Sequence, residues 1–201
     1  MRAALKTLGL AFRDVWQELW TILIVHLLFL LGNILIVAGP PVTLALFFYG
    51  NRIAHGETAN ERDFLNAIRD YWKPAWRWGF MNLVAVGLLI GDYYLTGKLI
   101  NNPNTAHLIQ GLYITLLSGW VLLQIFSLPF LFEQKQPSVI QALRNSAVFI
   151  QRNLIFVLTL MLLLVLSLMV GTLAFMLTFV FGGAFVAFAS NHAVLEGLRE
   201  H

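Results

Sequence analysis

The sequence predicts an all-α polytopic membrane protein, and three observations support this class. Of its 201 residues, 59% are hydrophobic and only 11% are charged, whereas soluble domains average roughly 45–50% and 25%. The mean hydropathy is +0.75, and several apolar stretches are long enough to cross a bilayer. So few charged side chains cannot cover a soluble globule, and most of the apolar surface must face lipid. We therefore expect residues 1–201 to form a single integral membrane domain.

Hydropathy places the membrane segments along the chain. Four stretches can cross a hydrocarbon layer of roughly 30 Å, namely residues 16–38, 76–97, 107–132 and 154–195. The last would extend about 63 Å as one helix, so we expect a hairpin that turns near Gly171 to Phe175. Residues 41–54 follow the break Gly39-Pro40-Pro41 and would extend only about 21 Å, which is short for a crossing.

The distribution of Lys and Arg decides whether this short segment crosses, because cytoplasmic loops are enriched in these residues. If residues 41–54 do not cross, the thirteen cations divide nine against four. If they do cross, Lys98 alone lies outside, and the other twelve lie inside: Arg2, Lys6, Arg13, Arg52, Arg62, Arg69, Lys73, Arg77, Lys135, Arg144, Arg152 and Arg199. We therefore predict six membrane segments, one of them short and started by proline, with both termini in the cytoplasm.

Two loops on the predicted inner side have the pattern of amphipathic surface helices. In the first, apolar residues recur at helical spacing from Phe64 to Trp72, and Thr58 with Glu61 or Asp63 offers a start signal. The second begins at Ser138, which forms a capping-box pattern with Gln141. We expect both helices to lie flat on the membrane surface.

These two helices also suggest an internal parallel repeat. Residues 64–70 and 139–145 match in character at all seven positions when they are aligned. Each copy would hold an inward segment, a surface helix and an outward segment, which gives candidate repeats over residues 41–97 and 107–172. The alternative is that any helix on a membrane surface has this pattern.

No enzyme motif is present, so we expect no catalytic activity and no cofactor, catalytic or metal-binding residue. The absence of cysteine excludes disulfides and thiolate sites. Intramembrane polar residues are the better candidates because their burial in lipid is costly. They are His26 and Asn33 on one helix face, and Asn82, Asp92 and Gln124.

Each of these polar residues has a structural alternative to a functional role. His26, Asn33, Asn82 and Gln124 fit hydrogen bonds between helices as well as a polar pathway. Asp92 lies near the outer surface, where its carboxylate can snorkel to water. Gly183, Ala187 and Asn191 recur every fourth position and predict a close helix contact.

Four cations on the predicted surface helices are candidate contacts to anionic lipid headgroups or to a partner: Arg69, Lys73, Arg144 and Arg152. The cations of the whole chain are spread over short loops, so we expect no nucleic-acid partner.

The order of features over nearly the whole chain resembles the YesL-like family of bacterial multi-pass membrane proteins. The resemblance rests on a first span, the motif Gly39-Pro40-Pro41-x-Thr43-x-Ala45-Leu46-Phe47, and an amphipathic stretch from Asp63 to Trp78 that runs into a span. The family has no established activity, and its genes often lie beside those of sugar-uptake ABC transporters.

This resemblance implies a bacterial inner-membrane protein that acts as an accessory or partner-binding component in carbohydrate uptake. The implied partners are the lipid bilayer, a sugar ABC transporter or another membrane protein, and a second copy of the chain. The alternative is a small transporter or channel with a polar pathway at the repeat interface.

Overall fold

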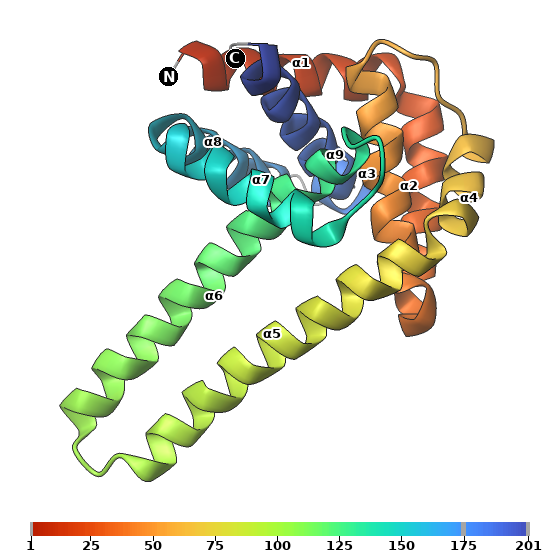
Figure 1. The fold of residues 1–201 in the computed structure, drawn as a ribbon. Coiled ribbons are helices and arrows are strands. Elements are labelled where there is room, and N and C mark those ends of the chain that lie inside the picture. The colour runs from red at the N-terminus through yellow and green to blue at the C-terminus, as the bar shows by residue number, and fades with distance from the viewer. Residues whose placement is uncertain (1, 174–175, 200–201) are drawn as a thin grey trace.

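A computed structural model describes residues 2–173 and 176–199, and every secondary-structure element in these ranges is helical (Figure 1). The elements are α1 (Arg2–Gln17), α2 (Leu19–Ile34), a 3₁₀ turn η1 (Ile36–Ala38), α3 (Gly39–Ala54), α4 (Glu61–Asp70), α5 (Trp72–Leu99), α6 (Pro103–Phe132), α7 (Val139–Arg152), α8 (Leu154–Leu173) and α9 (Met176–Arg199). The predicted all-α class is confirmed. Within the described ranges, α5 and α6 are long and apolar enough to cross a membrane, and the number rises to four if the bent pairs α1–α2 and α7–α8 each count as one span.

The helices follow one another as three units of the same order. Each unit has an amphipathic helix, a one-residue corner and two apolar helices: α1–α2–α3, α4–α5–α6 and α7–α8–α9. The corner residues are Glu18, Tyr71 and Asn153. The N–H of each corner residue donates to the carbonyl four residues earlier (3.0, 2.9 and 2.9 Å), and its carbonyl accepts from the N–H four residues later (2.8, 2.8 and 2.9 Å). The chain bends by 94° at the first corner and by 99° at the third.

The first predicted span, residues 16–38, is corrected by these boundaries. The chain turns at Glu18, α2 ends at Ile34, and the 3₁₀ turn follows. The reason is that α1 has a buried face of its own, Ala4 to Val15, which packs on α8 and α9. Contacts with helices far along the chain, rather than local hydropathy, determine where the first apolar helix begins.

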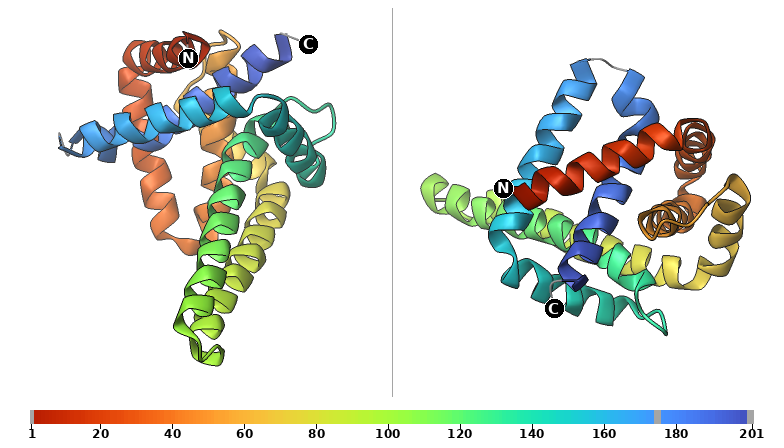
Figure 2. Two further views of the ribbon diagram at one scale, coloured as in Figure 1. Left: turned by 90° about the vertical axis from the view of Figure 1, so that its left-hand side faces the viewer. Right: turned by 90° about the horizontal axis from the view of Figure 1, so that it is seen from above.

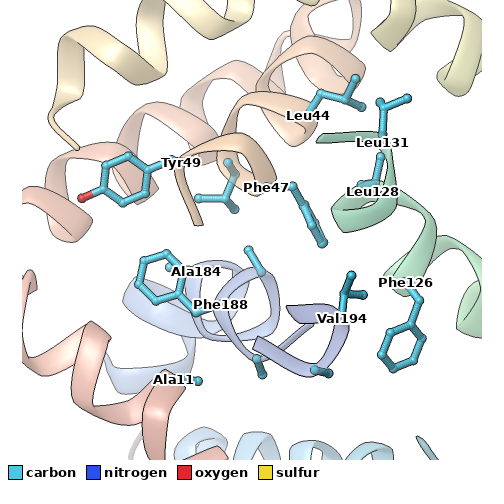
Figure 3. Packing of buried hydrophobic residues seen from close by; sticks show 14 of the residues in the cluster. Ala11, Leu44, Phe47, Tyr49, Phe126, Leu128, Leu131, Ala184, Phe188 and Val194 are labelled. Carbon is cyan, nitrogen blue, oxygen red and sulfur yellow. The ribbon is translucent and has the colours of Figure 1, made fainter. Parts of the chain in front are cut away.

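The short helix α3 is stable because it is surrounded. Pro40 and Pro41 lie in its first turn, where a missing N–H costs nothing. It contacts α2, α4, α5, α6 and α9, and most of its residues between Gly39 and Asn51 are buried. Figure 3 shows side chains of α3 packed against those of α6 and α9, with Tyr49 stacked on Phe188 at a centroid distance of 6.1 Å.

The α5–α6 hairpin projects from the rest of the molecule (Figure 1). Along its 28 residues, α5 buries only Ala75 and Thr96, and large apolar side chains such as Phe80, Leu83 and Leu88 are more than half exposed. Apolar surface of this extent requires lipid or another protein. The α8–α9 pair runs crosswise to this hairpin in both views of Figure 2. A hairpin was predicted for residues 154–195, and α8 and α9 are its two helices, whereas the connection at 174–175 lies outside the described residues.

Both predicted amphipathic helices form, as α4 and α7. The first was predicted from Phe64 to Trp72, but α4 ends at Asp70, and Trp72 begins α5 after the corner at Tyr71. Asn60, rather than Thr58, caps α4 and forms a reciprocal capping box with Asp63. Ser138 caps α7 as predicted and accepts from the Gln141 N–H at 3.4 Å. The Gln141 side chain bonds to Asn145 instead of completing the box.

Candidate functional site: polar side chains between apolar helices

Asn82 and Gln124 are brought together between α5 and α6. The Trp78 indole N–H donates to Gln124 Oε1 at 2.8 Å, and the Trp120 indole N–H donates to Asn82 Oδ1 at 2.9 Å. The Asn82 amide also donates to Gln124 Oε1 at 3.5 Å. Ser127, on the same helix as Gln124, adds a further bond at 3.3 Å. The network joins the two helices, as the hydrogen-bonding interpretation of these residues predicts.

His26 is buried against α9. Its side chain is 2% exposed and lies over Gly183, where an added Cβ would be 2.8 Å from His26 Cε1. The Phe29 ring lies beside it, at a centroid distance of 5.4 Å. Together with buried Ala187 and Asn191, this packing confirms the close contact that the small residues of α9 predict.

Asn33 does not share the environment of His26, although the two residues are seven apart. Asn33 is exposed near the end of α2, and its amide donates to the Phe29 carbonyl of its own helix at 2.9 Å. The two side chains therefore do not line a common path. Asp92 is also exposed, on the part of α5 that projects from the molecule.

A buried contact between Asp14 of α1 and His192 of α9 was not among the residues that the sequence analysis singled out. His192 Nε2 lies 2.6 Å from Asp14 Oδ2, and the two side chains are only 10% and 4% exposed. Arg13 contacts the other carboxylate oxygen at 3.2 Å. One signal was available, because Asp14 falls three residues after Ala11 on the small-residue face of α1 that includes Ala4.

A second polar group lies at the end of α3. The Asn51 amide donates to Glu133 Oε1, at the end of α6, at 2.6 Å. His55 Nε2 lies 3.5 Å from the same oxygen. Nearby on α9, Asn191 donates to the Phe47 carbonyl at 3.3 Å. These bonds connect α3 to α6 and α9 at the centre of the fold.

The four cations of the surface helices are accessible. Arg69 on α4, Lys73 at the start of α5, and Arg144 and Arg152 on α7 are all exposed. In the part of the chain that the structure describes, none of the four takes part in an ion pair of 4.0 Å or less. Their guanidinium and ammonium groups are thus available to an anionic surface.

These polar groups form hydrogen bonds and polar contacts between helices. Two of the bond sets each connect one pair of helices, α5 with α6 and α1 with α9, and the third connects α3 with both α6 and α9. Over residues 2–173 and 176–199, no three His, Asp or Glu side chains gather closely enough to hold a metal ion. The arrangement can fix helices relative to one another, and it presents cations at the surface.

Comparison with known proteins gives no match to a family model, to a curated protein or to a solved structure.

Proposed function

We propose that this chain is a multi-pass protein of the bacterial inner membrane that acts by interaction, as an accessory or partner-binding component associated with carbohydrate uptake. One observation carries the first part: the candidate polar residues do not line a common path, because Asn82 and Gln124 bond between α5 and α6, His26 packs on Gly183, and Asn33 bonds to its own helix. The association with uptake rests on the resemblance of the sequence to the YesL-like family.

In the proposed arrangement, six segments cross the membrane with both termini in the cytoplasm. The six are α2, α3, α5, α6, α8 and α9, and the twelve-to-one division of cations supports this orientation. As α3 is about 24 Å long and is enclosed by other helices, it spans with little contact to lipid. As α8 runs crosswise to α5 and α6, the third hairpin enters the bilayer at a strong tilt.

The surface helices α4 and α7 form the proposed contact surface. Their free cations Arg69, Lys73, Arg144 and Arg152 suit acidic side chains of a partner or anionic headgroups. In this proposal the helices arise from an internal duplication of residues 41–97 and 107–172, which correspond to α3–α4–α5 and α6–α7–α8.

A transporter is the second candidate, and the Asp14–His192 pair is the observation that favours it. Ionisable residues buried within a membrane protein often belong to ion or proton pathways. Against this, the pair lies between α1 and α9, whereas His26 contacts α9 at Gly183, more than two turns away along the same helix.

Copurification tests the proposal. We expect the tagged protein, extracted from native membranes, to retain other integral membrane proteins, including subunits of a sugar transporter. The double variant Arg69→Glu/Arg144→Glu should lose them, while Lys98→Glu, in the last turn of α5, should keep them. Reconstituted protein should show no proton- or sugar-linked flux above empty liposomes. A flux that disappears in His26→Gln would replace this proposal by the transporter.

A further inference from the structure

We infer that α1 is an interfacial helix whose exposed apolar row, Leu5, Phe12 and Trp16, inserts into the surface of the bilayer. This inference rests on the proposed membrane arrangement, in which α2 crosses the bilayer. The inference assigns a lipid-binding surface to α1. From the sequence, this part of the chain was used only for its cations Arg2, Lys6 and Arg13, which set the orientation in the membrane.

The row is a second face of α1, separate from the face that packs on protein. Leu5, Phe12 and Trp16 are 50%, 63% and 70% exposed. Spacings of seven and four residues place them on one side of the helix. The side that includes Ala4 and Ala11, about 100° around the helix from the row, is fully buried, and α1 contacts α8 and α9. The helix is therefore already docked on protein, and the apolar row needs a different partner.

Continuity with α2 identifies that partner as lipid. On α2, which follows the Glu18 corner, exposed apolar residues also lie on one side of the helix: Trp20, Leu27 and Leu31 are 76%, 56% and 52% exposed. If α2 crosses the bilayer, its exposed apolar side contacts hydrocarbon. Since the bend between α1 and α2 is 94°, α1 then lies in the plane of the membrane, at the depth of the interface. Tryptophan side chains are favoured at this depth.

The charges of α1 suit the same surface. Arg2, Lys6 and Arg13 lie on the side adjoining the apolar row, and the side chains of Lys6 and Arg13 are more than half exposed although each contacts an acid. The acid of α1, Asp14, points inward to His192. An apolar row flanked by cations is typical of helices that lie on anionic membranes.

The backbone at the three corners has the same hydrogen-bond pattern, and this similarity is a separate argument for placing α1 at the membrane surface. The first corner matches those before α5 and α8 in its hydrogen bonds. Its dihedral angles, φ −102° and ψ 22°, also resemble those of the other two, −97° and 13°, and −119° and 32°. By this match, α1 holds the same position in its unit as the predicted surface helices α4 and α7 hold in theirs.

Depth measurement by spin labelling tests the inference, and the absence of cysteine from the natural chain makes single labels simple to introduce. Nitroxides are attached to F12C, L5C, K6C and L27C in the full chain. The labelled proteins are reconstituted in vesicles of zwitterionic and anionic phospholipid. Collision with oxygen, which partitions into lipid, is compared with collision with a water-soluble nickel complex.

We expect the oxygen-to-nickel collision ratio at positions 5 and 12 to exceed that at position 6 several-fold and to approach that at position 27. If either L5C or F12C fails to fold, the other variant tests the prediction by itself. A water-like ratio at 5 and 12 with a lipid-like ratio at 27 would overturn the inference and leave the membrane arrangement intact. Labels at 5 and 12 that are shielded from both reagents would show that protein covers the row, which also overturns it. A water-like ratio at 27 would refute the crossing of α2, and the inference with it.

Discussion

Several polar residues in this chain form hydrogen bonds that hold two helices together. Gln124 accepts from Trp78 on α5 and from Ser127 on its own helix, so one amide oxygen serves three hydrogen-bond donors when Asn82 is included. Interhelical bonds of this kind contribute about 0.6–2 kcal/mol in membrane proteins. Their value here is to hold α5 beside α6, because the hairpin buries little else of α5.

The packing of His26 gives a residue-scale prediction. Replacement Gly183→Ala should lower the stability of the protein, because the new Cβ would lie 2.8 Å from His26 Cε1 and 3.3 Å from Phe29. Overpacking costs about 1–3 kcal/mol, which exceeds the gain in helix propensity of up to about 1 kcal/mol. Thermal denaturation in detergent should therefore show a Tm lower by several degrees.

The matched control is Gly87→Ala on α5, since nothing lies within 4 Å of the position that its Cβ would take. This variant should keep or slightly raise the Tm. An unchanged Tm in Gly183→Ala would mean that α2 and α9 are not in close contact at His26.

At the scale of elements, the contact between Asp14 and His192, 2.6 Å apart, holds α1 on α9 together with the packing of Ala4 and Ala11. Replacement His192→Leu leaves Asp14 buried with Arg13 as its remaining partner. Breaking a fully buried pair by removing one partner costs about 3–5 kcal/mol, and the 10% exposure of His192 and the remaining Arg13 contact reduce this cost here. We expect hydrogen exchange of the α1 amides to accelerate strongly, while the amides of α5 and α6 keep their protection.

The exposed pair between Lys6 and Glu196, 2.6 Å apart, connects the same two helices and provides the control. Because exposed ion pairs contribute about 0–1 kcal/mol, Lys6→Ala should change the exchange of α1 little. Equal effects of the two variants would show that the His192 bond does not determine the docking of α1.

At the scale of the whole molecule, the proposed topology is open to direct labelling. Cysteines introduced singly at Ala3, Asn60, Asn102, Gln136 and Ala174 should react with an impermeant thiol reagent on intact cells only at positions 102 and 174. Position 102 caps α6 at the end of the α5–α6 hairpin, and position 174 follows α8 in sequence.

Reaction at 60 but not at 3 would show that α3 does not return through the membrane. Absence of reaction at 174, with reaction at 102, would show that the crosswise α8–α9 hairpin stays on the inner side. Permeabilised cells, in which all five positions should react, provide the control for accessibility.

The sequence by itself determined the all-α class and the positions of most helices after the first predicted span. The all-α class, α3 after the proline pair, the long helices α5 and α6, and both surface helices α4 and α7 follow from hydropathy and from capping residues within a few positions of each helix end. These signals are local, because amphipathic periodicity and N-caps act over one or two turns.

The tertiary structure alone decided which polar side chains meet and where the first span begins. Asp14 and His192 are 178 positions apart, and nothing near either residue encodes the other. Likewise, His26 and Asn33 share a helix face, but only His26 is buried under α9. The burial of a side chain depends on which helix packs over it. Helix docking depends on whole helix surfaces and not on local sequence. For this reason only the three-dimensional structure shows the corner at Glu18, the contact between Asp14 and His192, and the crosswise direction of α8.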